Sequence, residues 1–105
     1  MGGGNSPAIA CRGGQAFLRL VRESCPMFRG EASANCWWTG FFLKYKGYDP
    51  RKGYGYVLTN RDGLVAKVWG FVDDFLIHAL TEHLCHKAKH FFIDVAHRLG
   101  SFVTP

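Results

Sequence analysis

Residues 70–78 read GFVDDFLIH and place two adjacent carboxylates, Asp73 and Asp74, between two short apolar runs. Neighbouring carboxylates repel each other and have to stay hydrated, so the pair predicts either a tight turn in water or a bound cation. Paired carboxylates are suited to holding Mg²⁺ or Mn²⁺, which prefer hard oxygen ligands and assist phosphoryl transfer. Asp73 and Asp74 are therefore the candidate catalytic and metal-binding residues.

A second candidate region interleaves basic and aromatic side chains. Such a pattern could hold phosphates and stack bases, or it could be an exposed loop with tyrosines half-packed on a core. The residues are Lys44, Tyr45, Lys46, Arg51, Lys52 and Tyr54. A net charge of +5 and a pI near 9.2 favour an anionic partner, with nucleic acid the first candidate and an anionic membrane the second.

Four histidines share one face of a predicted helix over residues 80–99: His83, His86, His90 and His97. His86 and His90 have the i, i+4 spacing that can bind zinc. Cys85 points away from that face, and no glutamate lies between two histidines in an HExxH pattern. We therefore expect a solvated polar face here.

The composition is that of a folded domain. The chain has 105 residues, 48% of them hydrophobic and 20% charged, which suits one modest domain or part of a larger one and excludes disorder. No apolar run approaches the ~20 residues of a membrane span. The four cysteines form no CxxC pair and no signal peptide precedes them, so we expect free thiols and an intracellular location.

The N-terminal half predicts a helix followed by strands or loops. Ser6 can cap a helix over residues 6–25, Pro7 suits its first position, and Cys25-Pro26 should end it. Gly13 and Gly14 weaken its middle, which suggests close approach of another backbone or a ligand. Residues 37–63 should form an aromatic and basic strand-loop segment, with strands near 37–45 and 54–59.

The C-terminal half gives clearer patterns. Residues 60–63 (NRDG) predict a turn, residues 65–78 predict a hairpin with the aspartates at its tip, and residues 80–99 predict a helix. One stripe of that helix is apolar and consists of Leu80, Leu84, Ala88, Phe91, Val95 and Leu99; Gly100 is placed to cap its end. The fold class is therefore α+β, an antiparallel hairpin or small sheet packed on two helices.

The motifs resemble a known family. FVDDFLI resembles the catalytic motif of reverse transcriptases, in which an aromatic residue, any residue and two aspartates form a β-turn in the palm domain. GGGNSPAIACRGGQAFLRL is similar to the upstream palm motif of retroelement enzymes, and HRLGSFVTP resembles the helix end and turn that follow the aspartates. The resemblance implies part of a palm domain.

This resemblance implies RNA-directed DNA polymerase ancestry with two-metal chemistry using Mg²⁺ or Mn²⁺. Asp73 and Asp74 would bind metal, and the implied partners are an RNA or DNA template-primer and a deoxynucleoside triphosphate. The residues that match nucleotide- or template-binding positions are Gly2, Asn5, Ser6, Pro7, Arg12 and Phe71.

The chain departs from the family pattern in three ways. Ala10-Cys11 and then Arg12 stand where the family often has an aromatic residue and glutamine, and residues 45–58 resemble an insertion. A further catalytic aspartate on an earlier strand and a later lysine have no counterpart in the sequence. We therefore expect a palm fragment that is inactive alone and whose open sheet edges favour self-association. The alternatives are a non-enzymatic nucleic-acid-binding module and a structural protein in which the aspartates form a solvated turn.

Overall fold

One antiparallel sheet and two helices make up the computed structural model, which describes residues 7–32, 37–38 and 40–100. In chain order the elements are β1 (Ala8–Arg12), α1 (Gln15–Ala32), β2 (Phe42–Asp49), β3 (Gly53–Asn60), β4 (Gly63–Gly70), β5 (Asp74–His78) and α2 (Glu82–Leu99). The five strands lie in the order β1-β5-β4-β3-β2, so β1 and β2 are the edges. The predicted α+β class is confirmed.

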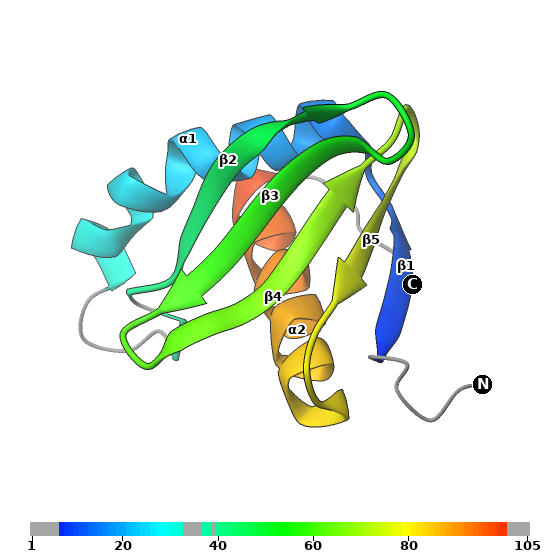
Figure 1. Ribbon diagram of the computed structural model, residues 1–105. Helices are drawn as coiled ribbons and strands as arrows, with labels where there is room; N and C mark the ends of the chain where they lie inside the picture. Colours follow the sequence, from blue (N-terminus) through cyan, green and yellow to red (C-terminus); the bar gives the residue numbers. More distant parts are fainter. Residues whose placement is uncertain (1–6, 33–36, 39, 101–105) are drawn as a thin grey trace.

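Both helices lie on the same side of the sheet and leave the other side open (Figure 1). Helix α1 packs mainly on β2, and α2 packs on β4, β1 and β5. Because side chains alternate along a strand, each strand sends one set of residues to the helices and the other to the open face. On β5, Phe75 and Ile77 are buried, whereas Asp74 is exposed.

The core lies between the sheet and the helices and is rich in aromatic rings. Phe75 of β5 stacks on Phe17 of α1 with centroids 5.8 Å apart and meets Phe92 of α2 at 4.9 Å. A second group joins Phe41 to Phe91, whose centroids are 5.3 Å apart. Burial of these large rings accounts for much of the driving force for docking the helices on the sheet.

The prediction of one helix over residues 6–25 is wrong. Ala8–Arg12 is a strand that pairs antiparallel with β5, and the helix begins only at Gln15. The hydrogen bonds of that ladder outweigh the local helix signals at Pro7, and Gly13 (φ 127°) provides the break between strand and helix. The helix backbone also continues through Pro26 to Ala32 rather than ending at Cys25.

The segment 37–63 is more regular than the sequence suggested. Strand β2 runs from Phe42 to Asp49 instead of over the predicted residues 37–45, residues 37–38 belong to a turn, and β2 forms a hairpin with β3. Cross-strand tyrosine contacts explain the extension, since Tyr48 and Tyr54 have centroids 4.9 Å apart. The stretch 45–58 that resembles an insertion is thus this hairpin, and the predicted turn at residues 60–63 is confirmed between β3 and β4.

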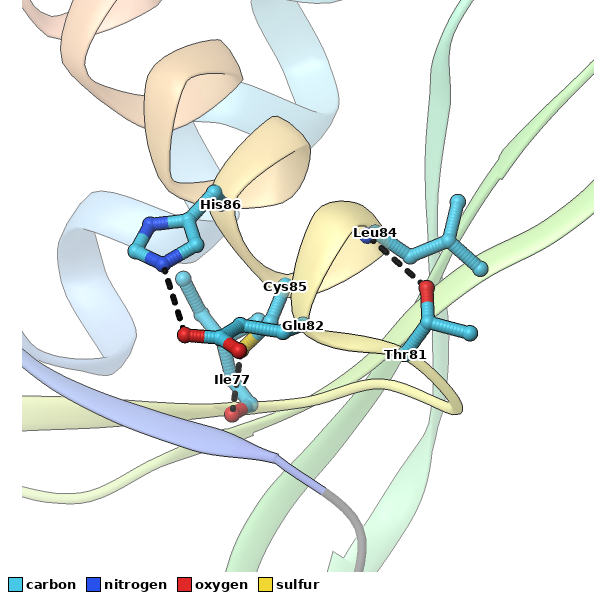
Figure 2. Close-up of polar contacts among 6 residues, drawn as sticks. All are labelled: Ile77, Thr81, Glu82, Leu84, Cys85 and His86. Atoms are coloured by element: carbon cyan, nitrogen blue, oxygen red, sulfur yellow. Dashed lines mark hydrogen bonds and ion pairs between the residues drawn. The ribbon is translucent and has the colours of Figure 1, made fainter.

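Helix α2 agrees closely with the prediction for residues 80–99. Thr81 is its N-cap and accepts a hydrogen bond from the Leu84 N–H at 3.1 Å (Figure 2), and Gly100 ends it in the left-handed conformation (φ 73°). Ala88, Phe91 and Val95 are buried, as the apolar stripe requires. The prediction that Leu80 belongs to that stripe is wrong, because Leu80 precedes the helix and is 74% exposed.

Candidate functional site

The Asp73–Asp74 pair lies at the tip of the β4–β5 hairpin, as predicted. Strand β4 ends at Gly70, Asp73 belongs to the turn, and Asp74 is the first residue of β5. The Phe71 N–H donates to the Asp74 carbonyl at 2.7 Å and closes the turn. Both carboxylates are exposed, so their mutual repulsion is relieved by water.

Main-chain contacts from the β1–α1 junction clamp this turn. The Gly13 N–H donates to the Asp73 carbonyl at 2.9 Å, and the Gln15 N–H donates to the Phe71 carbonyl at 3.0 Å. A Cβ atom on Gly14 would lie 2.0 Å from the Val72 carbonyl oxygen, so only glycine fits. The expectation that the Gly13-Gly14 pair permits close approach of another backbone is confirmed, and that backbone is the aspartate turn.

The carboxylate pair could provide oxygen ligands to one divalent ion, but the residues that the structure describes around it do not complete a two-metal site. The strand beside Asp74 is β1, and the residue opposite Asp74 in the register is Arg12, a cation. In the part of the chain that the structure describes, no three His, Cys, Asp or Glu side chains are grouped to hold a metal.

A basic and aromatic groove lies on the open face of the sheet next to this turn. Its volume is about 520 Å³, and it is lined by Arg51, Lys52, Lys67, Trp69, Phe71, Leu76 and His78. The lining contains three permanent cations and no carboxylate. Leu76 follows Asp74 by two residues on the same face of β5, so the groove adjoins the acidic turn.

Trp69 forms the floor of this groove. Its ring lies against Gly55 of the neighbouring strand, where an added Cβ would be 2.6 Å from the indole. The Lys52 ammonium is 5.1 Å from the ring centroid, within the range of a cation–π contact. Proteins that bind single-stranded nucleic acid commonly combine aromatic rings with cationic side chains in one groove.

The structure brings some of the predicted site residues together. Phe71, Arg51 and Lys52 meet in the groove, and Arg12 lies across from Asp74. Pro7 lies at the other end of β1, where its carbonyl accepts a hydrogen bond from the Ala79 N–H at 3.1 Å. Gly2, Asn5 and Ser6 lie outside the described residues.

The rest of the predicted basic and aromatic stretch is divided between the two sides of the sheet. Lys44, Tyr45 and Lys46 line a different hollow of about 700 Å³ at the β2 edge. Tyr54 lies on the same face of β3 as the buried Tyr56, which is the helix-covered face. Tyr45 meets Tyr56 at 5.4 Å, and Arg22 of α1 lies over its ring. The stretch is therefore not one continuous binding surface.

Sequence reasoning missed Lys67, Trp69 and His78, all of which line the groove. The alternation in GLVAKVWG could have identified two of them, since Lys67 and Trp69 are two residues apart and so share a face. His78 pairs with Lys67 across β4 and β5, a register that the sequence alone does not give.

The predicted polar face of α2 is confirmed for His83, His86 and His90, which are exposed and line one hollow. Cys85 points to the opposite side and is buried, as expected. Cys11 and Cys85 are free thiols. Burial raises the pKa of the Cys11 thiol to about 11, although the positive charge of Lys89 acts to lower it. Burial also raises the pKa of the Cys85 thiol, so burial favours the protonated, poorly nucleophilic form of both groups.

Comparisons with protein families, with curated proteins and with solved structures found no match for this chain. Within the described residues, neither helix is long and apolar enough to cross a bilayer. The functional assignment therefore depends on the motifs and on the geometry around the Asp73–Asp74 turn.

Proposed function

We propose that this chain is a segment of an RNA-directed DNA polymerase palm that binds nucleic acid through the open face of its sheet. The observation that carries the proposal is the position of Asp73 and Asp74 at a clamped hairpin tip, with both carboxylates exposed beside a basic groove. A palm has to present its carboxylates to a primer end and to metal-bound phosphates, which requires such a rigid and accessible turn.

The chain by itself should be a poor catalyst. Two-metal nucleotidyl transfer needs carboxylates that bridge both ions, and the described neighbour of Asp74 on β1 is Arg12. Nucleic-acid binding does not depend on a further carboxylate of this kind. Arg51, Lys52 and Lys67 can neutralise phosphates whether or not a metal is present.

A primer-extension assay, run beside filter binding of a primer-template over a salt series, tests this proposal. We expect no measurable extension with Mg²⁺ or Mn²⁺, and binding that weakens steeply as salt rises. NMR titration with Mg²⁺ should shift the amides of residues 71–76 and leave α2 unchanged. Absence of any Mg²⁺ shift would contradict a metal-binding turn, and robust extension would contradict the account of the incomplete site.

The groove also favours a second candidate function, a non-enzymatic module that binds single-stranded nucleic acid. Trp69 and Lys52 offer ring stacking and phosphate contact without any need for Asp73. The two candidates differ in metal dependence, because only the palm proposal requires Mg²⁺ to bind at residues 71–76.

Charge-removing variants locate the binding surface for either candidate. Lys52→Gln with Lys67→Gln should weaken oligonucleotide binding and lower the slope of log affinity against log salt by about 0.7 for each lost phosphate contact on a single strand. Lys87→Gln is the matched control, because Lys87 lies on α2, away from the open face. Equal losses in both variants would mean that binding is not located in the groove, and no binding at all would leave a structural role.

A further inference from the structure

A row of four side chains crosses the open face of the sheet from one strand to the next. Lys44 of β2 lies opposite Val57 of β3 in the strand register, and Val57 lies opposite Lys67 of β4. Lys67 in turn lies opposite His78 of β5. Each of the four follows a residue that is buried in the core beneath the sheet, so alternation directs all four to the open face. We call them the cross-strand row.

The cross-strand row joins two hollows. Lys67 and His78 line the groove of about 520 Å³, whereas Lys44 and Val57 line the hollow of about 700 Å³ at the β2 edge. Neighbouring strands lie about 4.8 Å apart, so the backbone distance along the row from His78 to Lys44 is about 14 Å. The two hollows are therefore parts of one track across the open face.

The charges along this track are not neutralised by the protein. Neither hollow is lined by a carboxylate. Among the residues that the structure describes, no ion pair engages Lys44 or Lys67. Asp74 shares the open face of β5 but is four residues, about 13 Å along the strand, from His78. Two free ammonium groups in a line, with an imidazole at one end, complement a chain of phosphates.

An aromatic ring lies beside the row. Trp69 follows Lys67 by two residues on the same face of β4, about 7 Å along the strand, and Gly55 is its register partner on β3. An added Cβ on Gly55 would lie 2.6 Å from the indole, so the ring occupies the space above this glycine. A base can stack on such a ring only when it is not already paired inside a duplex. The ring therefore favours a single strand.

We propose that one single strand of nucleic acid lies across the sheet from β5 to β2, with its phosphates along the cross-strand row and a base on Trp69. This inference rests on the proposed binding of nucleic acid to the open face, and it adds the form of the ligand and its path. The strand leaves the groove at Lys67, passes over Val57 and reaches Lys44 at the edge of the sheet.

Lys44→Gln tests the path, because Lys44 lies outside the groove. Binding of a labelled oligothymidylate is followed by fluorescence anisotropy over a salt series. We expect the slope of log affinity against log salt to fall by about 0.7, which corresponds to an affinity about fivefold lower near about 0.1 M salt. The unmodified chain should bind the oligothymidylate more tightly than the matching duplex.

Arg22→Gln is the matched control. Arg22 lines the same hollow as Lys44, but it belongs to α1 and lies over the Tyr45 ring on the helix side of the sheet. Removal of this charge should leave the affinity and the salt slope unchanged. A loss in Arg22→Gln as large as that in Lys44→Gln would overturn the path across the open face.

NMR with the same oligothymidylate separates this inference from the function on which it rests. Amide shifts should include residues 44 and 57 as well as the residues of the groove. Shifts that stop at the groove, or full affinity in Lys44→Gln, would overturn the path and leave binding in the groove intact. Equal affinity for the duplex would overturn the assignment of a single strand. Absence of any binding would overturn the proposed nucleic-acid function and this inference with it.

Discussion

Two turns of opposite charge lie side by side at one end of the sheet (Figure 1). The acidic turn carries Asp73 between β4 and β5, and the basic turn carries Arg51 and Lys52 between β2 and β3. They touch where an added Cβ on Gly53 would lie 2.4 Å from the Gly70 carbonyl oxygen. Together they place anionic and cationic groups at the rim of one groove.

The two turns are stabilised in different ways. The basic turn is held locally, since Asp49 Oδ1 accepts from the Arg51 N–H at 2.8 Å and the Asp49 carbonyl accepts from the Lys52 N–H at 3.0 Å. The acidic turn is held by hydrogen bonds from Gly13 and Gln15, more than fifty residues earlier in the chain. The acidic turn therefore relies on tertiary contacts, whereas the basic turn is held by hydrogen bonds within itself.

Gly14→Ala should have the largest effect, because it breaks the clamp on the acidic turn. The new Cβ would meet the Val72 backbone at 2.0 Å, and backbone cannot move aside as a side chain can. We expect a loss of about 3 kcal/mol in the free energy of unfolding, the upper part of the range for overpacking. Urea denaturation measures the loss, and NMR should show displaced amides at residues 71–74.

Gly47→Ala is the control for this variant. Gly47 has a φ of 131° but open space around its Cβ position, so alanine there adds only backbone strain of about 1 kcal/mol. If Gly14→Ala costs no more than Gly47→Ala, or leaves the amides of residues 71–74 unshifted, the clamp is not what holds the acidic turn.

The difference between local and tertiary stabilisation also explains which features could be predicted from the sequence. The hairpin tip at Asp73 follows from local turn and strand signals, and α2 follows from a single apolar stripe with Gly100 at its end. The clamp could not be predicted, because it depends on β1 pairing with β5 across more than sixty residues. Local signals at Pro7 favoured a helix, and the β1–β5 ladder overrides them.

The groove was only half predictable for a similar reason. Arg51, Lys52 and Phe71 stood out by residue type, but they were assigned to separate sites. Their union with Lys67 and Trp69 depends on strand register and on which face the helices cover. Tyr54 is the opposite case. It is close to lysines in the sequence, but the alternation of side chains along β3 places it on the helix-covered face, away from the groove.

Asp49→Ala should have an intermediate effect that stays local to the basic turn. It removes the acceptor of the Arg51 N–H, and a hydrogen bond of this kind contributes about 1 kcal/mol. Amide shifts should be confined to residues 49–53 in a heteronuclear correlation spectrum. Shifts of similar size at residues 71–74 would mean that the two turns form one cooperative unit rather than two separately stabilised ones.

The smallest effect on stability should come from replacing both aspartates of the acidic turn, Asp73→Asn with Asp74→Asn. Their carboxylates are exposed, and the turn is held by main-chain groups that these substitutions leave intact. The free energy of unfolding should change by no more than about 0.5 kcal/mol, as for most surface substitutions. Metal-free binding of an oligonucleotide should stay level or strengthen, because two charges that repel phosphate are gone. Urea denaturation and filter binding measure the two quantities on the same variant. A loss of stability comparable to that of Gly14→Ala would mean that the carboxylates themselves hold the turn, and weakened metal-free binding would mean that they contact the nucleic acid rather than stand beside it.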